Sequence, residues 1–338
     1  MLKKFLIFFL MMSVVLLILE LILSLFFPLN LVGGYIGAYE YNKQLGVKLK
    51  PSIHFLHTTD FQQEVYTNKD GLVNYQSDFS KYKSLAYAVG DSFTQGTGLP
   101  SDASYPLQLD LMLNIGEDNK YKNNIAVVNL GLGAYGGEQS LIVLNENIDK
   151  RKSPAYILYL GYSNDHVDDQ LFLSGYRHKH LVDGSPYWGV FLQPLQWVSN
   201  SLEIGKRLKV IVGSFRRKRQ VNLPSTSEAS EKENVAKLQI SVFKRLKEIA
   251  KKNNSILIVG WAENPSDNSM SYEWLRRWSE NNNVEFADWY TSVKSVQNNI
   301  PNLPVYNEHS GGHYRTWVNT IIARTYADII KKNELKKY

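Results

Sequence analysis

The strongest constraint on the fold is a series of short apolar runs that alternate with segments of helical periodicity. Runs of four to six apolar residues are typical of strands buried on both faces, and apolar residues spaced three or four apart predict amphipathic helices. The expected strands are residues 85–89, 126–130, 156–160, 256–261 and 284–287, and the expected helices are residues 105–114, 139–148, 234–252, 271–281 and 316–332. Buried strands joined through helices pair in parallel. The sequence therefore predicts an α/β fold with three layers, in which a mostly parallel sheet lies between two layers of helices.

An apolar segment near the N-terminus predicts a membrane anchor. Residues 5–27 carry a single charged side chain, Glu20, and a helix of this length, at about 1.5 Å per residue, spans a hydrocarbon core of about 30 Å. Pro28 ends the helix, and no small-residue cleavage site follows it. Because Lys3 and Lys4 precede the run, we expect the N-terminus in the cytoplasm and the rest of the chain on the outer side. Residues 1–28 are therefore the expected signal anchor of a single-pass membrane protein.

The rest of the chain divides by composition. Residues 29–83 are polar and mixed and are expected to cover the core, whereas residues 84–338 form the α/β domain with an insertion at about residues 168–233. The net charge of +6 is concentrated in residues 206–220, but no nucleic-acid recognition module accompanies them, so we expect no nucleic-acid partner. The chain has no cysteine, and no His or carboxylate cluster has metal-ligand spacing, so no metal and no cofactor are expected. The oligomeric state stays open.

Three of the expected strands end in polar loops that contain glycine. They are Gly90-Asp91-Ser92, residues 131–136 (GLGAYG) and residues 161–165 (GYSND). The carboxyl ends of parallel strands meet at one edge of a sheet, so these loops are expected to converge there. A serine nucleophile needs a base, usually histidine, and N–H donors aimed at the oxyanion. Ser92 is the candidate nucleophile, and its own N–H, an amide of the second loop and the Asn164 side chain are candidate donors.

These blocks resemble the SGNH (GDSL-type) hydrolases. GDSFTQG, NLGLGAYGGEQ, GYSND and NEHSGGHYRTWVNTIIA occur in the family's order across roughly residues 84–330, with Phe93 where the family has a smaller residue. The resemblance implies an SGNH-hydrolase or flavodoxin-like sheet, Ser92 as nucleophile and Asn164 as oxyanion amide. The family's usual loop glycine falls on Ala134, so either Ala134 or Gly133 supplies the second oxyanion donor.

The fourth block supplies the expected histidine but departs from the family pattern. The family has an aspartate three residues before its histidine, whereas Ser310 precedes His313 by three residues and Tyr306 precedes His309 by three. The distance to the closing helix favours His313 as the base and keeps His309 as the alternative. The resemblance and the residues together predict a Ser–His dyad, with the imidazole oriented by a backbone carbonyl or by Glu308.

The substrate class is suggested by a stretch that precedes the first block. Residues 64–75 (EVYTNKDGLVNY) resemble a preamble in membrane-anchored family members linked to cell-surface polysaccharide genes. This resemblance implies a serine esterase or O-acyltransferase that acts on an acylated, O-acetylated carbohydrate through an acyl-serine intermediate. Two alternatives stay open: a lipase or phospholipase-type esterase, favoured by the aromatic insertion and the anchor, and a catalytically degenerate glycan-binding scaffold, favoured by the missing aspartate.

Overall fold

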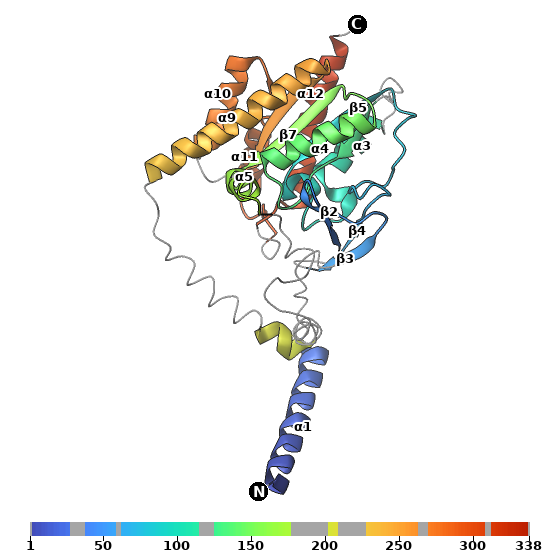
Figure 1. Cartoon of the computed structure of the whole chain (residues 1–338), viewed down its shortest axis with the longest axis vertical. Coiled ribbons are helices and arrows are strands. Elements are labelled where there is room, and N and C mark those ends of the chain that lie inside the picture. The colour runs from blue at the N-terminus through green and yellow to red at the C-terminus, as the bar shows by residue number, and fades with distance from the viewer. Residues whose placement is uncertain are drawn as a thin grey trace.

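The computed structural model describes residues 2–27, 38–58, 62–114, 125–176, 202–208, 228–262, 270–307 and 312–336. A layered α/β domain forms most of the molecule, and an N-terminal helix lies outside its layers (Figure 1). The central sheet has five parallel strands in the order β6-β5-β7-β8-β9. Their bounds are β5 (Ser84–Gly90), β6 (Ile125–Asn129), β7 (Tyr156–Tyr162), β8 (Ile256–Ala262) and β9 (Glu285–Phe286). The expected α/β fold with a parallel sheet is thereby confirmed.

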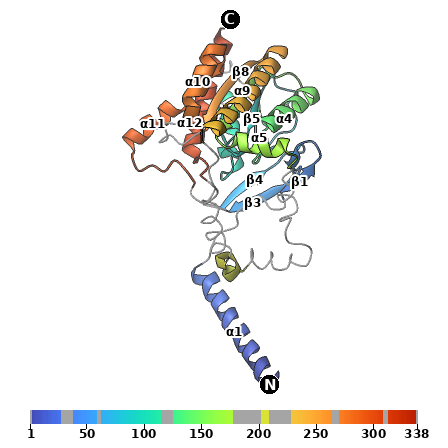
Figure 2. The same cartoon turned by 60° about the vertical axis from the view of Figure 1, so that its left-hand side comes forward.

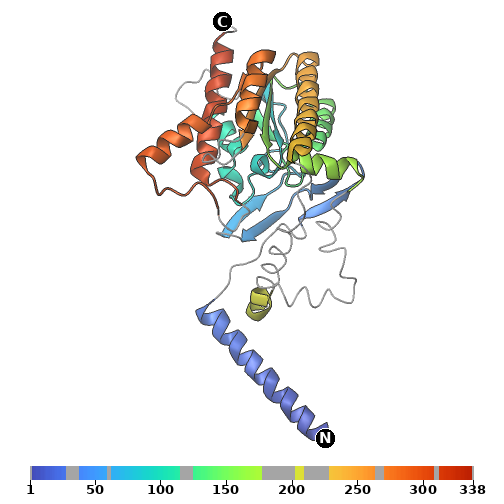
Figure 3. The same cartoon turned by 90° about the vertical axis from the view of Figure 1, so that its left-hand side faces the viewer.

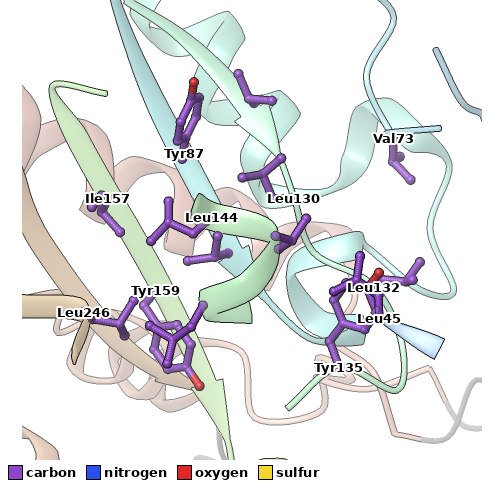
Figure 4. Close-up of a cluster of buried hydrophobic side chains, with 14 of the residues drawn as sticks. Leu45, Val73, Tyr87, Leu130, Leu132, Tyr135, Leu144, Ile157, Tyr159 and Leu246 are labelled. Atoms are coloured by element: carbon purple, nitrogen blue, oxygen red, sulfur yellow. The ribbon is translucent and has the colours of Figure 1, made fainter. Parts of the chain in front are cut away.

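Helices cover both faces of the sheet, because each strand buries its side chains alternately on one face and the other. In β5, for example, Ala86 and Ala88 belong to one buried cluster, and Leu85, Tyr87 and Val89 belong to the second. The first cluster is completed by α3 (Tyr105–Asn114), α11 (Tyr290–Asn299) and α12 (Thr316–Leu335). The second, part of which is drawn in Figure 4, is completed by α4 (Gly137–Lys150), α9 (Glu228–Lys252) and α10 (Met270–Asn282).

All five expected helices are present, with ends that differ by a few residues. The largest difference is at α9, which begins at Glu228 rather than at residue 234. The first residues of the expected insertion, which begins at about residue 168, form part of helix α5 (Asp165–Leu173). Residues 177–201 and 209–227 of that insertion lie outside the described residues.

The segment that precedes β5 forms two antiparallel hairpins. They are β1 (Tyr39–Asn42) with β2 (Gly46–Leu49), and β3 (His54–Thr58) with β4 (Gln62–Tyr66). Both lie at the edge of the sheet where its strands end (Figure 3). Val47, Leu49 and Val65 from these hairpins belong to the same buried cluster as the sheet. The hairpins are therefore packed into the domain's own hydrophobic core.

Asn74, which follows the hairpins, joins this segment to the outer strand of the sheet. Its Nδ2 donates to Val127 O at 3.1 Å, and its Oδ1 accepts from Asn129 N at 2.9 Å. These two bonds satisfy backbone groups of β6 that face no strand among the described residues, so a side chain takes the hydrogen bonds that an adjacent strand would make at this edge.

Helix α1 (Leu2–Phe26) is long and apolar enough to cross a membrane, by length and composition. It projects away from the domain (Figure 2). Glu20 lies within its apolar sequence and accepts hydrogen bonds from Glu203 N at 2.6 Å and Ile204 N at 3.0 Å. These are the first N–H groups of the short helix at residues 203–208, so the one acidic side chain of the expected span is paired with helix-terminal donors.

Candidate active site

The candidate site lies at the carboxyl edge of the sheet, between β5 and β7. The strand order reverses at this point, because β5 leads to β6 on one side and β7 lies on its other side. In open α/β sheets ligands bind at such a switch point. Gly90 ends β5 with φ +151, and a Cβ there would lie 2.5 Å from Leu160 O of β7. Only glycine fits this close approach of the two strands.

Ser92 begins a short helix, α2 (Ser92–Gln95), directly after β5. Asp91 is the N-cap residue, and its Oδ1 accepts a hydrogen bond from Phe93 N at 2.9 Å. Gly96 ends the helix in the left-handed conformation, with φ +87. The strand, the cap and the glycine together fix the half-buried Ser92 side chain at the edge of the sheet.

His313 lies beside Ser92 although it is distant in sequence. Its Nε2 is 2.6 Å from Ser92 Oγ. The backbone at His313 is fixed by two contacts: Asn307 N donates to His313 O at 2.8 Å, and Tyr306 pairs with Tyr314 across an antiparallel bridge. These contacts determine where the imidazole starts from the chain. At this distance a neutral imidazole accepts the serine proton. Two further residues considered from the sequence, His309 and Glu308, lie outside the described residues.

Phe93 packs against the histidine. Its ring centroid lies 4.8 Å from that of His313, 4.8 Å from that of Tyr314 and 4.6 Å from that of Tyr162. These separations are typical of favourable aromatic pairs. The bulkier residue in the first block therefore fills the space beneath the imidazole and restricts its movement.

Two buried carboxyl groups lie behind the serine. Burial raises the pKa of Asp91 to about 7, and the hydrogen bond from Phe93 N opposes this rise. Burial and the charge of Asp91 raise the pKa of Asp165 well above its usual range. Asp165 Oδ2 accepts hydrogen bonds from Tyr159 Oη at 2.8 Å and from Tyr162 N at 3.1 Å. Both groups therefore have a raised pKa and hold protons more tightly than an exposed aspartate, chiefly because burial disfavours the charged form.

The glycine loop after β6 presents two amides that differ in their partners. Gly133 N donates to Gln95 Oε1 at 2.6 Å. Ala134, in contrast, has φ +76, and its N–H makes no hydrogen bond with the described residues. A side chain at Gly133 would begin 3.6 Å from Ser92 Cβ and 3.7 Å from the Tyr39 hydroxyl. The loop therefore adjoins the nucleophile, and hairpin strand β1 reaches the same point.

Asn164, the third candidate donor, is exposed at the end of β7, just before α5. Its Nδ2 donates to Asp168 Oδ2 at 3.0 Å. Burial raises the pKa of Asp168 to about 6. Since an amide nitrogen carries two hydrogens, one N–H of Asn164 remains for another acceptor.

The structure thus brings Ser92, His313 and the glycine loop together at one edge. Two neighbours, Gln95 and Tyr39, were missed from the sequence. Gln95 stands within the first block (GDSFTQG), a signal that it adjoins the site, whereas nothing in the sequence links Tyr39 to the loop. Among the described residues no group of three or more His or carboxylate side chains has the arrangement of a metal site.

Comparison with known proteins gives similarities of fold. No protein-family model matches the chain, and no curated protein matches it in sequence. A member of the lipolytic protein G-D-S-L family from Veillonella parvula has a TM-score of 0.42 at 12% identity, over 73% of this chain and 98% of that one. The psychrotrophic esterase EstA from Pseudoalteromonas sp. has a TM-score of 0.39 at 12% identity, over 74% and 97% of the two chains. Both are similar to this chain in fold at low sequence identity.

Proposed function

We propose that this protein is a membrane-anchored serine esterase or O-acyltransferase that acts on an acylated carbohydrate, with acetyl as the acyl group. The observation that carries the reaction type is the distance of 2.6 Å between His313 Nε2 and Ser92 Oγ. A serine hydroxyl is a weak nucleophile on its own, and an imidazole within hydrogen-bond reach activates it. If no base lay near the Ser92 hydroxyl, a structural role for this serine in its turn would be favoured instead.

The proposed reaction proceeds through an acyl-serine. Ser92 Oγ attacks the ester carbonyl carbon while its proton passes to His313 Nε2, and the carbonyl oxygen becomes an oxyanion. His313 then returns the proton to the leaving alcohol oxygen as the carbon–oxygen bond breaks. Water or a sugar hydroxyl then attacks the acyl-serine carbonyl carbon and gives its proton to His313 Nε2. The bond between the acyl carbon and Ser92 Oγ breaks as His313 returns the proton to Ser92 Oγ, which releases the acid or the acylated sugar and restores the free serine.

We assign the oxyanion to the N–H groups of Ser92 and of the glycine loop, with Asn164 as the third donor. Of the two loop amides, Ala134 is favoured because the Gly133 N–H already has an acceptor in Gln95. Glu308, which directly follows the last described residue of that segment, Asn307, stays the proposed orienting carboxylate for the imidazole. Donors held in place before the reaction stabilise the developing charge without reorganisation.

The location and the substrate class rest on the sequence. Helix α1 is long enough to span a membrane, and Lys3 and Lys4 before it favour a cytoplasmic N-terminus and an outer domain. The carbohydrate follows from the resemblance of residues 64–75, which form part of β4 and the turn after it. An outer domain beside the membrane has access to surface glycans as they are assembled.

The test is hydrolysis of p-nitrophenyl acetate by the full chain in detergent. Ser92→Ala should reduce turnover to the background rate, and His313→Ala should reduce it by orders of magnitude. Ser153→Ala is the matched control, because Ser153 Oγ donates only to Asn253 Oδ1 on the surface, and should keep full activity. Unchanged turnover in Ser92→Ala would refute the proposal.

The acceptor is tested separately with an acetylated donor and an unacetylated oligosaccharide. Mass spectrometry then distinguishes free acetate, the product of hydrolysis, from an acetylated oligosaccharide, the product of transfer. Absence of both products with sugar esters, beside normal hydrolysis of p-nitrophenyl acetate, would contradict the carbohydrate assignment and leave the reaction type intact.

A further inference from the structure

Gln95 links the helix of the nucleophile to the glycine loop. It is the last residue of α2, three positions after Ser92, and its side chain is 2% exposed. Its Oε1 accepts the hydrogen bond from Gly133 N at 2.6 Å, whereas its Nε2 is buried and has no hydrogen-bond partner among the described residues. An unsatisfied buried amide nitrogen lowers stability, so its retention calls for an explanation.

The orientation of this amide follows from its partner. Exchange of the Gln95 oxygen and nitrogen would place an NH₂ group against the Gly133 N–H, so that two donors would face each other. The oxygen therefore faces the loop. The Gly133 N–H donates to Gln95 and is therefore not available to another acceptor. Gly133 lies beside the nucleophile, because a Cβ on it would be 3.6 Å from Ser92 Cβ.

The next residue in the loop carries backbone strain. Ala134 has φ +76, a left-handed conformation that is strained for a residue with a Cβ. Such strain persists only where the surroundings impose it, and it occurs often at active sites. Here the Leu132–Gly133 peptide, one peptide before that of the Ala134 N–H, is held by Gln95 through Gly133 N, and Tyr135 N, after Ala134, donates to Leu132 O at 3.0 Å. Ala134 is thus fixed from both sides.

We propose that Gln95 is a positioning residue for the oxyanion site: by holding the Gly133 N–H, it leaves the Ala134 N–H as the loop amide that stabilises the oxyanion. This inference rests on the proposed esterase or acyltransferase reaction. Gln95 acts through the loop and makes no contact with the reacting atoms. Without its acceptor oxygen, the Gly133 N–H is unsatisfied, and the loop is free to turn that amide toward the serine in place of the next one.

Gln95→Leu removes the acceptor while keeping a buried side chain of similar size. The full chain is prepared in detergent, and folded protein is quantified by circular dichroism and gel filtration. We expect kcat for p-nitrophenyl acetate to fall by about tenfold or more, since small displacements of catalytic groups have effects of this order. KM should change by less than about twofold, because the lost interaction forms only in the transition state.

A second readout distinguishes positioning from simple loss of stability. Phenylboronic acid forms a tetrahedral adduct with an active-site serine and places an oxygen where the oxyanion forms. Its affinity should fall by the same factor as kcat, since both depend on the same donors. Destabilisation alone would lower the amount of folded protein but would leave kcat per folded molecule and the boronic acid affinity unchanged.

Gln108→Leu is the matched control. Its side chain makes two hydrogen bonds, donating to Ala103 O at 2.6 Å and accepting from Thr320 Oγ1 at 2.6 Å, whereas Gln95 makes the one to Gly133 N; the control should keep wild-type kcat. Gln95→Met replaces the leucine variant if that variant does not fold. A folded Gln95 variant with kcat within threefold of wild type, or with reduced kcat and unchanged boronic acid affinity, overturns the inference. A wild-type chain without esterase activity and without fluorophosphonate labelling overturns the proposed function as well.

Discussion

Asp169 provides a quantitative test of the electrostatics around the site. It lies on α5 with its side chain 2% exposed, and its Oδ1 accepts from Glu138 N, in the first turn of α4, at 2.7 Å. A Cβ on Gly136 would lie 2.4 Å from the same oxygen, so the glycine loop packs directly against this carboxyl group. Burial raises the pKa of Asp169 to about 7, and the hydrogen bond from Glu138 N opposes the rise.

The sign of the pH effect follows from that direction. In the unfolded chain an aspartate has a pKa of about 3.9, so between pH 4 and 7 the folded protein holds a proton that the unfolded chain releases. Stability therefore falls as pH rises through this window. From pH 5 to the folded value of about 7, at about 1.4 kcal/mol per pH unit, the loss is about 3 kcal/mol.

Asp169→Asn removes this titration. The free energy of unfolding is measured for both proteins by urea denaturation and tryptophan fluorescence at pH 5 and pH 8. The variant's free energy of unfolding, relative to that of the wild type, should be about 3 kcal/mol higher at pH 8 than at pH 5. The variant retains an acceptor oxygen for the Glu138 N–H. Asp328→Asn, at an exposed position on α12, is the control and should follow the wild-type profile. A difference between Asp169→Asn and wild type that is the same at both pH values would refute the reasoning.

Two further substitutions test the packing of the site. Ala134→Gly relieves the strain of φ +76 and should raise the free energy of unfolding by about 1 kcal/mol, visible as a higher Tm in thermal unfolding; a lower Tm would contradict the strain. Phe93→Ala removes a ring 4.8 Å from that of His313 and should cost about 3–5 kcal/mol of stability. It should also lower kcat per folded molecule, measured with p-nitrophenyl acetate, and an unchanged kcat would show that the ring does not hold the imidazole.

Most of the sheet was predictable from the sequence because burial on both faces produces continuous apolar runs. Helix α11 was not predicted, because its sequence YTSVKSVQNN contains few apolar residues and only Val293 is buried within it. The hairpins were also missed as a pair. Their strands have four or five residues, which is too short for the alternation of a half-buried strand to stand out.

The loops of the site were predictable, whereas their detailed geometry was not. Ser92 and the glycine loop were placed at one edge by the rule for parallel strands, and the structure has them there. The bond between Gln95 and Gly133 joins residues 38 positions apart, and no local pattern encodes it. The strained φ of Ala134 was equally hidden, because alanine is usually found in ordinary backbone conformations.

The hairpins have a consequence for the order in which the chain folds. Gln139 Nε2 donates to Leu45 O across 94 residues, and Tyr135 Oη donates to Val47 O across 88. The hairpin β1–β2, which is synthesised before the sheet, therefore cannot make these contacts until the glycine loop and α4 have been synthesised. His313 reaches Ser92 across 221 residues, so the pair forms only when nearly the whole chain is available. Contacts of such long range slow folding, so the catalytic pair is completed among the last steps, after the local contacts of the domain.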